Sequence, residues 1–270
     1  MENLEITSVN NELVKEVVKL QQKKHRDEEK KFLLEGFKPI EEAIKSGIEI
    51  EHLFVNKNNN VMLNLFQHLI SEQPCDPEIN SGRRIEIKLI LTTEPVLKKI
   101  STTDSPPDAV AVAKQKIFTL DDIKSAKKVV LLENIKDLGN LGTILRTAKA
   151  FSQDAVILFG DTVDLYNPKC VRSAVGNLWK IPVIQIKDFS VLKSQFESFE
   201  RVATLPKAED TVFLKDYKAT SPYLIMFGSE ADGLSKELID FATKKVTIEM
   251  NSDVESLNLS VSVGIILHTI

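Results

Sequence analysis

Cysteine is scarce in this sequence, and positive charge is not in excess. The two cysteines, Cys75 and Cys170, are far apart and have no partner motif, which argues against a disulfide framework or a structural zinc site and favours a reducing cytoplasm. The formal net charge of −4 at pH 7 indicates that the protein as a whole does not attract nucleic acid. Any RNA site must therefore be a local basic patch on a mildly acidic protein.

Long apolar runs and glycine-rich phosphate loops are also missing. No apolar run is long enough to span a bilayer, and the polar, acidic first residues are not typical of a signal peptide. No Gly-x-Gly occurs among the ten glycines and no Walker A loop is present, which disfavours a dinucleotide-binding oxidoreductase and a P-loop NTPase. No His, Cys and Asp residues have metal-ligand spacing, so we expect neither a metal nor a membrane as partner.

The composition is that of a soluble globular protein with one large domain or two ordinary ones, since 43% of the 270 residues are hydrophobic and 27% charged. Apolar runs of strand length alternate with helical patterns along the whole chain. The strands predicted in the first half cover residues 31–35, 51–55, 84–91 and 109–113, and those in the second half cover 129–132, 155–159, 182–186, 202–205, 223–227 and 246–248. The pattern predicts an α/β fold with a small α/β domain at residues 1–116 and a mostly parallel sheet, covered on both faces, at residues 117–270.

Three polar clusters follow predicted strands in the second half. Residues 133–142 lead into a helix that carries Arg146, residues 227–234 follow another strand, and residues 255–260 enter the last helix, with Ser256 as a plausible N-cap. Each loop alone is more easily read as a structural turn or cap. Open α/β sheets bind their ligands at the carboxyl ends of their strands, so three such loops together predict a pocket at that edge.

These clusters resemble, in the same order, the three signature motifs of the SpoU (TrmH) family of RNA 2′-O-ribose methyltransferases in the SPOUT superfamily. The matching stretches are residues 140–148, 224–235 and 248–262, and residues 166–176 resemble the family's Arg-x-Ser-x-Gly segment. Residues 6–36 resemble the L30e-like substrate-binding domain that is often fused to this domain. The resemblance covers nearly the whole chain.

The resemblance implies a C-terminal α/β trefoil knot that forms a homodimer, with the active site completed across the interface. S-adenosylmethionine would be held largely by backbone groups, at positions that fall on Gly228, Ile248 and Leu257. The implied reaction is methyl transfer to a ribose 2′-hydroxyl of structured RNA, with ribosomal RNA favoured over tRNA. A tRNA ribose methyltransferase, a base-nitrogen methyltransferase and a non-catalytic RNA-binding member of the same fold are the alternatives.

The catalytic positions implied by the resemblance are Asn140, Arg146, Glu230, Ser256 and Asn258. The family proposal makes the arginine a general base, although a guanidinium group is almost always protonated. We therefore assign Arg146 to holding the substrate phosphate and stabilising the developing alkoxide. Glu230 would orient Arg146 by a bidentate pair, and Asn140 and Asn258 would fix the loops. The chain departs from the family pattern beside these positions, with Leu138 and Glu249 where prolines are usual and with Ser152 and Ala231 where glycines are usual.

A basic stretch lies near the N-terminus, where residues 15–31 hold seven Lys and Arg residues against four acidic ones. Such a stretch is often only a solvated helix face. As a functional site it would supply sequence-independent phosphate contacts to RNA. The candidate RNA contacts are Lys23, Lys24 and Arg26, together with Arg172 in the second half.

Overall fold

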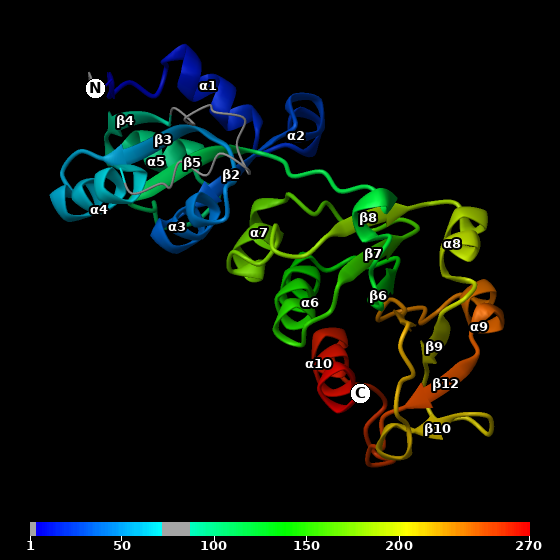
Figure 1. Cartoon of the computed structure of the whole chain (residues 1–270). Helices are drawn as coiled ribbons and strands as arrows, with labels where there is room; N and C mark the ends of the chain where they lie inside the picture. Colours follow the sequence, from blue (N-terminus) through cyan, green and yellow to red (C-terminus); the bar gives the residue numbers. More distant parts are fainter. Residues whose placement is uncertain (1–3, 72–86) are drawn as a thin grey trace. The chain divides into compact units, whose positions relative to one another are not determined.

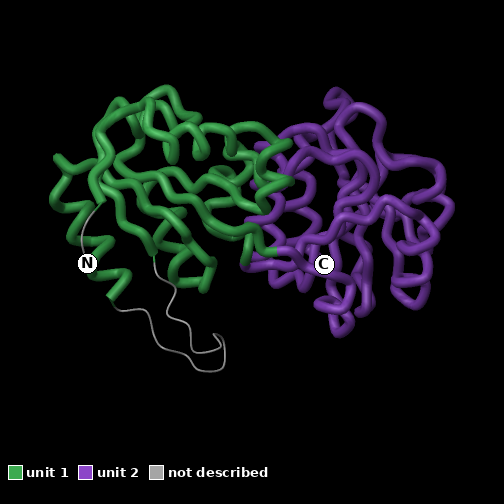
Figure 2. Tube along the Cα trace, turned by 90° about the horizontal axis from the view of Figure 1, so that it is seen from above, with its two compact units in different colours: residues 1–116, 166–179 green, residues 117–165, 180–270 purple. Residues whose placement is uncertain are grey.

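The chain folds into two compact units, which Figure 1 and Figure 2 show in a computed structural model that describes residues 4–71 and 87–270. The first unit combines Met1–Lys116 with Tyr166–Trp179, and the second combines Ile117–Leu165 with Lys180–Ile270. The sequence predicted two consecutive domains, so the place of Tyr166–Trp179 in the first unit differs from that prediction. Cys75 and the start of the predicted strand 84–91 lie outside the described residues.

The first unit is built on a sheet of five strands in the order β1-β4-β3-β5-β2. The strands are β1 (Leu4–Ile6), β2 (Lys31–Glu35), β3 (Ile50–Asn56), β4 (Lys88–Thr92) and β5 (Ala109–Lys114). The helices are α1 (Glu12–Lys19), α2 (Lys23–Glu29), α3 (Phe37–Lys45), α4 (Asn60–Ser71), α5 (Glu94–Ile100) and α7 (Pro168–Ala174). β5 pairs antiparallel with β2 and β3, and the other pairs are parallel. This is the mixed α/β layer that the alternation of strands and helices predicted.

Helix α1 is amphipathic and packs its apolar side on this sheet. Asn11 caps its N-terminus by accepting a hydrogen bond from the Leu13 amide at 2.9 Å. Val14 and Val17 are buried in a core that also contains residues of β3, β4 and β5. The basic stretch 15–31 is therefore not one solvated helix, because α1 ends at Lys19 and the shorter α2 follows.

The segment Tyr166–Trp179 belongs to the first unit because it packs on β2. The Phe32 ring lies 4.8 Å from the Tyr166 ring and 6.3 Å from the Trp179 ring, measured between centroids. Arg172 on α7 donates to Glu35 at the end of β2, with an Nη1–Oε2 distance of 2.6 Å. These contacts join residues that are more than a hundred positions apart in sequence, so local patterns do not predict them.

The second unit contains a parallel sheet of seven strands in the order β10-β12-β9-β11-β6-β7-β8. The strands are β6 (Lys128–Glu133), β7 (Ala155–Phe159), β8 (Val183–Ile186), β9 (Glu200–Thr204), β10 (Val212–Phe213), β11 (Tyr223–Phe227) and β12 (Lys244–Thr247). The helices are α6 (Leu138–Ala150), α8 (Phe189–Phe196), α9 (Lys236–Phe241) and α10 (Leu259–Thr269), and short 3-10 turns cover Leu120–Ile123 and Leu214–Asp216. Six of these strands were predicted, and the two-residue β10 was missed.

The central strands of this sheet are buried throughout. Every residue of β7 and β11 is buried, as are five of the six residues of β6, which is the pattern of a parallel sheet covered on both faces. Helices α6 and α10 lie side by side (Figure 1). The predicted α/β class with a mostly parallel sheet is confirmed, while the trefoil knot stays a prediction. Within the described ranges, no helix has the length and apolar character needed to cross a membrane.

Candidate active site

The carboxyl ends of four neighbouring strands meet at one edge of the parallel sheet. The order β12-β9-β11-β6 places these strands side by side, so the residues that follow them lie along the same edge. The three polar clusters found in the sequence follow β6, β11 and β12. The fold therefore brings the first loop together with two loops that follow it about a hundred residues later in the chain.

A chain of side-chain hydrogen bonds links the three loops. Asn140 near the start of α6 donates through Nδ2 to the Glu230 carboxylate in the loop after β11. Asn258 at the start of α10 donates through Nδ2 to the Asn140 Oδ1 atom at 3.1 Å. We call Glu230, Asn140 and Asn258 the polar triad. Glu230 and Asn258 are exposed and Asn140 is half-buried, so this edge presents ordered polar groups to solvent.

Helix caps fix the two asparagines of the polar triad. Asp137 caps α6 and accepts from the Asn140 amide at 2.7 Å. Asn258 caps α10, and its Oδ1 accepts from the Ser260 amide at 2.9 Å, which leaves its Nδ2 group free to reach Asn140. The prediction that Ser256 caps this helix is wrong, because Asn258 holds that position and Ser256 is exposed ahead of it.

The loop after β11 closes on itself and depends on glycine. A Cβ atom at Gly228 would collide with the carbonyl carbon of Gly233 and the amide nitrogen of Leu234. Gly233 has a φ of +67° and donates from its amide to the Ser229 carbonyl at 3.0 Å. A substitution at Gly228 therefore disturbs the loop itself, whatever ligand it binds.

Glu133 is an anchor that the sequence analysis did not single out. It is the last residue of β6, is buried, and accepts from the Ser235 amide at 2.7 Å through Oε2. Ser235 in turn caps α9, accepting from the Leu238 amide. The first and second loops are thus joined below the surface by Glu133 and at the surface by the polar triad. In the sequence, the only indication of this anchoring role is the position of Glu133 at the end of a strand.

Arg146 is not part of this network within its own chain. It lies six residues after Asn140 on α6, and because a helix turns about 100° per residue, the two side chains leave different sides of it. In the described part of the chain, the exposed Arg146 side chain makes no hydrogen bond or ion pair. The predicted pair between Glu230 and Arg146 does not form among the described residues of one chain, where Glu230 accepts from Asn140.

The three residues proposed for cofactor binding lie in loops at the same edge. Gly228, Ile248 and Leu257 are half-buried, and among the described residues their backbone amide and carbonyl groups form no hydrogen bond. A half-buried backbone group without a protein partner is suited to binding a ligand. The sequence analysis overlooked the loop that begins at Leu205, although β9 ends between β12 and β11, because that loop contains no glycine or asparagine.

The departures from the family motifs fit their local structure. Leu138 is the first residue of α6, a position where proline is favoured but not required. Ser152 has a φ of +53°, which explains why glycine is usual at this position. Glu249 forms an ion pair with Lys215, with an Nζ–Oε2 distance of 2.6 Å. No group of three or more His, Cys, Asp or Glu residues that could hold a metal ion occurs in the described ranges.

The four candidate RNA contacts have different environments. Lys23 and Lys24 are exposed on α2, as expected for residues that meet phosphate groups. Arg26 is only 1% exposed and donates to the Leu20 carbonyl at 2.7 Å. The prediction of a phosphate contact by Arg26 is therefore wrong, because its guanidinium group stabilises the turn after α1. Arg172 is committed to Glu35 within the first unit.

The comparisons with known proteins agree with this arrangement. Residues 127–268 match the SpoU rRNA methylase family, and residues 11–111 match the MRM3-like substrate-binding domain. The chain is 31% identical to an uncharacterized tRNA/rRNA methyltransferase of Synechocystis sp., over 97% of this chain and 92% of that protein. It is 27% identical to the 23S rRNA (guanosine(2553)-2′-O)-methyltransferase of Bacillus subtilis, over 98% of both proteins.

A solved structure extends the similarity to three dimensions. The S-adenosylmethionine-bound rRNA methyltransferase from Sinorhizobium meliloti superposes with a TM-score of 0.83 at 28% identity, covering 98% of this chain and 96% of that one. The similarity therefore includes both units and all three loops at the sheet edge. The chain belongs to the SpoU rRNA methylase family.

Proposed function

We propose that this chain transfers a methyl group from S-adenosylmethionine to a ribose 2′-hydroxyl of ribosomal RNA. As a member of the SpoU family, it is an S-adenosylmethionine-dependent RNA methyltransferase. The observation that supports the proposal most strongly is the polar triad, which unites all three family motifs at one sheet edge. The ribosomal substrate rests on relatives such as the 23S rRNA methyltransferase of Bacillus subtilis.

The loops at the sheet edge fit the cofactor through their free backbone groups. Gly228, Ile248 and Leu257 would hold it, because their half-buried amides and carbonyls have no partner in the described chain. When bound, the cofactor supplies an electrophilic methyl group on its sulfonium. The protein must then bring the ribose hydroxyl to this edge and exclude water from it.

The substrate side of the reaction requires groups that hold the ribose and stabilise negative charge. The Arg146 guanidinium group, which has no partner in residues 4–71 and 87–270, can bind the neighbouring phosphate with two hydrogen bonds and stabilise the developing alkoxide. The polar triad would fix the three loops relative to one another and offer amide groups to the ribose. Ser256 is exposed just before the cap of α10 and would contact the substrate.

The active site is completed by a second copy of the chain in our proposal. Val261 and Ile265, one turn apart on α10, are 49% and 37% exposed. Apolar side chains exposed on one helix face are typical of protein interfaces. Because Arg146 has no partner among the residues that the structure describes, we propose that it reaches the loops of the partner subunit in a homodimer formed through the second unit.

Replacing Arg146 with alanine tests the assignment. We expect methyl transfer to slow by about 100- to 1,000-fold, the usual cost of losing one charge-stabilising donor. S-adenosylmethionine affinity should stay nearly unchanged, because Arg146 faces the substrate. Arg146→Lys should also be impaired, since an ammonium group cannot reproduce a planar guanidinium fork. Single-turnover methyl transfer and calorimetry with the cofactor measure the two effects.

The matched control is Lys149→Ala, which removes an exposed cation from the same helix. Near-normal methyl transfer by Arg146→Ala, or an equal loss in the control, would contradict the catalytic role. A loss of cofactor affinity in Arg146→Ala would show instead that the residue supports the cofactor loops.

The identity of the RNA needs a separate experiment, because the Synechocystis relative is named for both tRNA and rRNA. Ribose-methylated nucleotides resist alkaline cleavage, so 2′-O-methyl sites can be mapped in total RNA from cells with and without this protein. Loss of a single site in ribosomal RNA is expected. Loss of a site in tRNA would favour the tRNA alternative, and a base methylation would favour another branch of the superfamily.

A further inference from the structure

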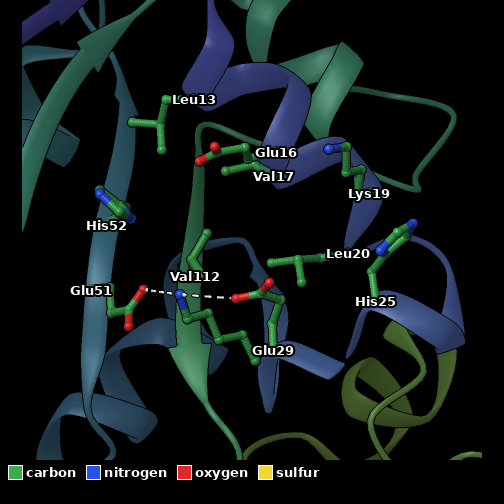
Figure 3. A pocket seen from close by; sticks show the side chains of 11 residues that line it. Leu13, Glu16, Val17, Lys19, Leu20, His25, Glu29, Glu51, His52 and Val112 are labelled. Carbon is green, nitrogen blue, oxygen red and sulfur yellow. Dashed lines mark ion pairs between the residues drawn. The ribbon is translucent and has the colours of Figure 1, made fainter. Parts of the chain in front are cut away.

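A pocket of about 250 Å³ lies in the first unit, far in sequence from the methylation motifs. Figure 3 shows that its walls come from α1, α2 and the strands β3 and β5. The comparisons match this part of the chain to a substrate-binding domain without assigning a binding site within it. The chemistry of the walls therefore has to indicate the ligand.

The floor of the pocket is apolar. Val17 from α1, Leu20 directly after α1 and Val112 from β5 line it; they are 3%, 4% and 2% exposed, so only their edges reach the pocket. Leu13 extends this surface and is half-buried. A flat apolar ligand face would displace water from this floor, which is favourable.

The rim of the pocket is polar and carries more negative than positive charge. Three carboxylates line it, from Glu16, Glu29 and Glu51, against the two ammonium groups of Lys19 and Lys31. The Lys31 Nζ atom pairs with Glu51 at 2.9 Å and lies 3.8 Å from Glu29 (Figure 3).

Glu16, Lys19 and His52 are the polar side chains of the lining left to recognise a ligand, and the carboxylate and the imidazole are those that can accept from a base. In the described part of the chain, the Glu16 carboxylate makes no hydrogen bond or ion pair. Burial lowers the pKa of His52, and this effect outweighs the nearby Glu51 carboxylate, which raises it. The imidazole is therefore neutral near pH 7, with one nitrogen to donate and one to accept a hydrogen bond.

These features exclude some ligands and favour one. A phosphate group would face a net negative rim, so the pocket is a poor phosphate site. A nucleobase has two flat faces, which suit the apolar floor, and an edge with N–H donors, which suits a carboxylate. Proteins recognise single-stranded RNA in this way, by stacking splayed bases and bonding to their edges. Guanine fits best, because two adjacent N–H groups on its edge can donate to one carboxylate.

We propose that this pocket binds an unpaired guanine of the RNA substrate, with the base against Leu13 and the accessible edges of the apolar floor and its N–H edge donating to Glu16. His52 lines the pocket from β3 (Figure 3). Lys23 and Lys24 directly precede His25, which also lines the pocket, so they are placed to meet the adjoining phosphates. The proposal rests on the proposed function insofar as it takes RNA to be the substrate.

The test measures binding of short single-stranded RNAs to the full chain by fluorescence anisotropy. The probes are a uridine oligonucleotide with one central guanosine and the same oligonucleotide with an abasic central position. We expect the guanosine probe to bind about tenfold more tightly, because the abasic probe lacks the N–H groups that donate to the Glu16 carboxylate. Equal affinity for the two probes would overturn the proposal.

Glu16→Gln distinguishes a base site from a phosphate site by the sign of its effect. A base site loses its carboxylate acceptor, so the guanosine probe binds more weakly while the abasic probe is little changed. A phosphate site loses a repelling charge, so both probes bind more tightly, and this outcome would overturn the proposal. Glu12→Gln is the matched control on the same helix, because Glu12 lies outside the pocket and pairs with Lys15.

His52→Ala is the second variant, with the exposed His68 on α4 as its control. Loss of discrimination between the two probes in His52→Ala but not in His68→Ala supports the proposal, and equal effects in both contradict it. Methyl transfer is measured separately with the unmodified chain. Failure to methylate any RNA, with discrimination intact, would reject the proposed function and leave the base pocket standing. Methylation without discrimination would reject only the pocket.

Discussion

The ion pair between Arg172 and Glu35 should be needed to hold α7 on β2. The Glu35 side chain is 2% exposed and accepts from the Thr102 amide at 2.7 Å, from the Thr102 hydroxyl at 2.8 Å and from Arg172 at 2.6 Å. Removing one partner of a buried pair typically costs about 3 to 5 kcal/mol. Arg172 itself is 36% exposed, and Glu35 keeps its two Thr102 donors, so the lower end applies. We expect Arg172→Met to destabilise the first unit by about 2 to 3 kcal/mol.

The assay is calorimetric unfolding of the full chain together with amide hydrogen exchange in Pro168–Ala174. At this size, a loss of about 2 to 3 kcal/mol lowers the midpoint by roughly 4 to 12 °C. Exchange in α7 should speed up most, because α7 loses its tether. Lys169→Met on the same helix is the control for helix propensity and exposed charge.

A double-mutant cycle decides whether the pair itself is responsible. Once Glu35→Gln has removed the buried charge, adding Arg172→Met should cost much less than it does alone. A loss below about 0.5 kcal/mol in Arg172→Met, which is the range of ordinary surface substitutions, would refute the reasoning. Additive losses in the double variant would refute it equally, since they would mean that the two residues act independently.

Three further predictions concern the loop after β11, helix α10 and the segment Tyr166–Trp179. Gly228→Ala should lower S-adenosylmethionine affinity and also destabilise the loop after β11, because the added Cβ meets Gly233. Calorimetry with the cofactor measures the affinity, and amide hydrogen exchange measures the stability of the loop. Normal values for both would contradict the prediction. Val261→Glu should convert the proposed dimer to monomers and lower methyl transfer while leaving the fold intact. Light scattering measures the oligomeric state and circular dichroism the fold. An unchanged dimer would exclude α10 from the interface. A chain truncated to begin at Ile117 should aggregate or lose order in Tyr166–Trp179, because it lacks the β2 surface on which that segment packs. A well-ordered segment in proton NMR spectra would contradict this prediction.

The sequence by itself determined the class of fold and the place of the site. The strands of the parallel sheet are short, fully apolar runs, such as Val129 to Leu132, and such runs are visible without any knowledge of the partners they pair with. Because parallel strands end at a common edge, the polar loops that follow them could be assigned to one site. The motif resemblance then supplied the family, which the comparisons confirm.

The tertiary structure decided which side chains meet. Glu230 accepts from Asn140 and not from Arg146, and Arg172 pairs with Glu35 across more than a hundred residues of sequence. The sequence places Arg26 in a basic stretch, but its side chain is buried and donates to the Leu20 carbonyl. The physical reason is common to all three. Periodicity and turn chemistry are local and can be read along the chain, whereas the partner of a polar side chain is set by which distant elements pack together.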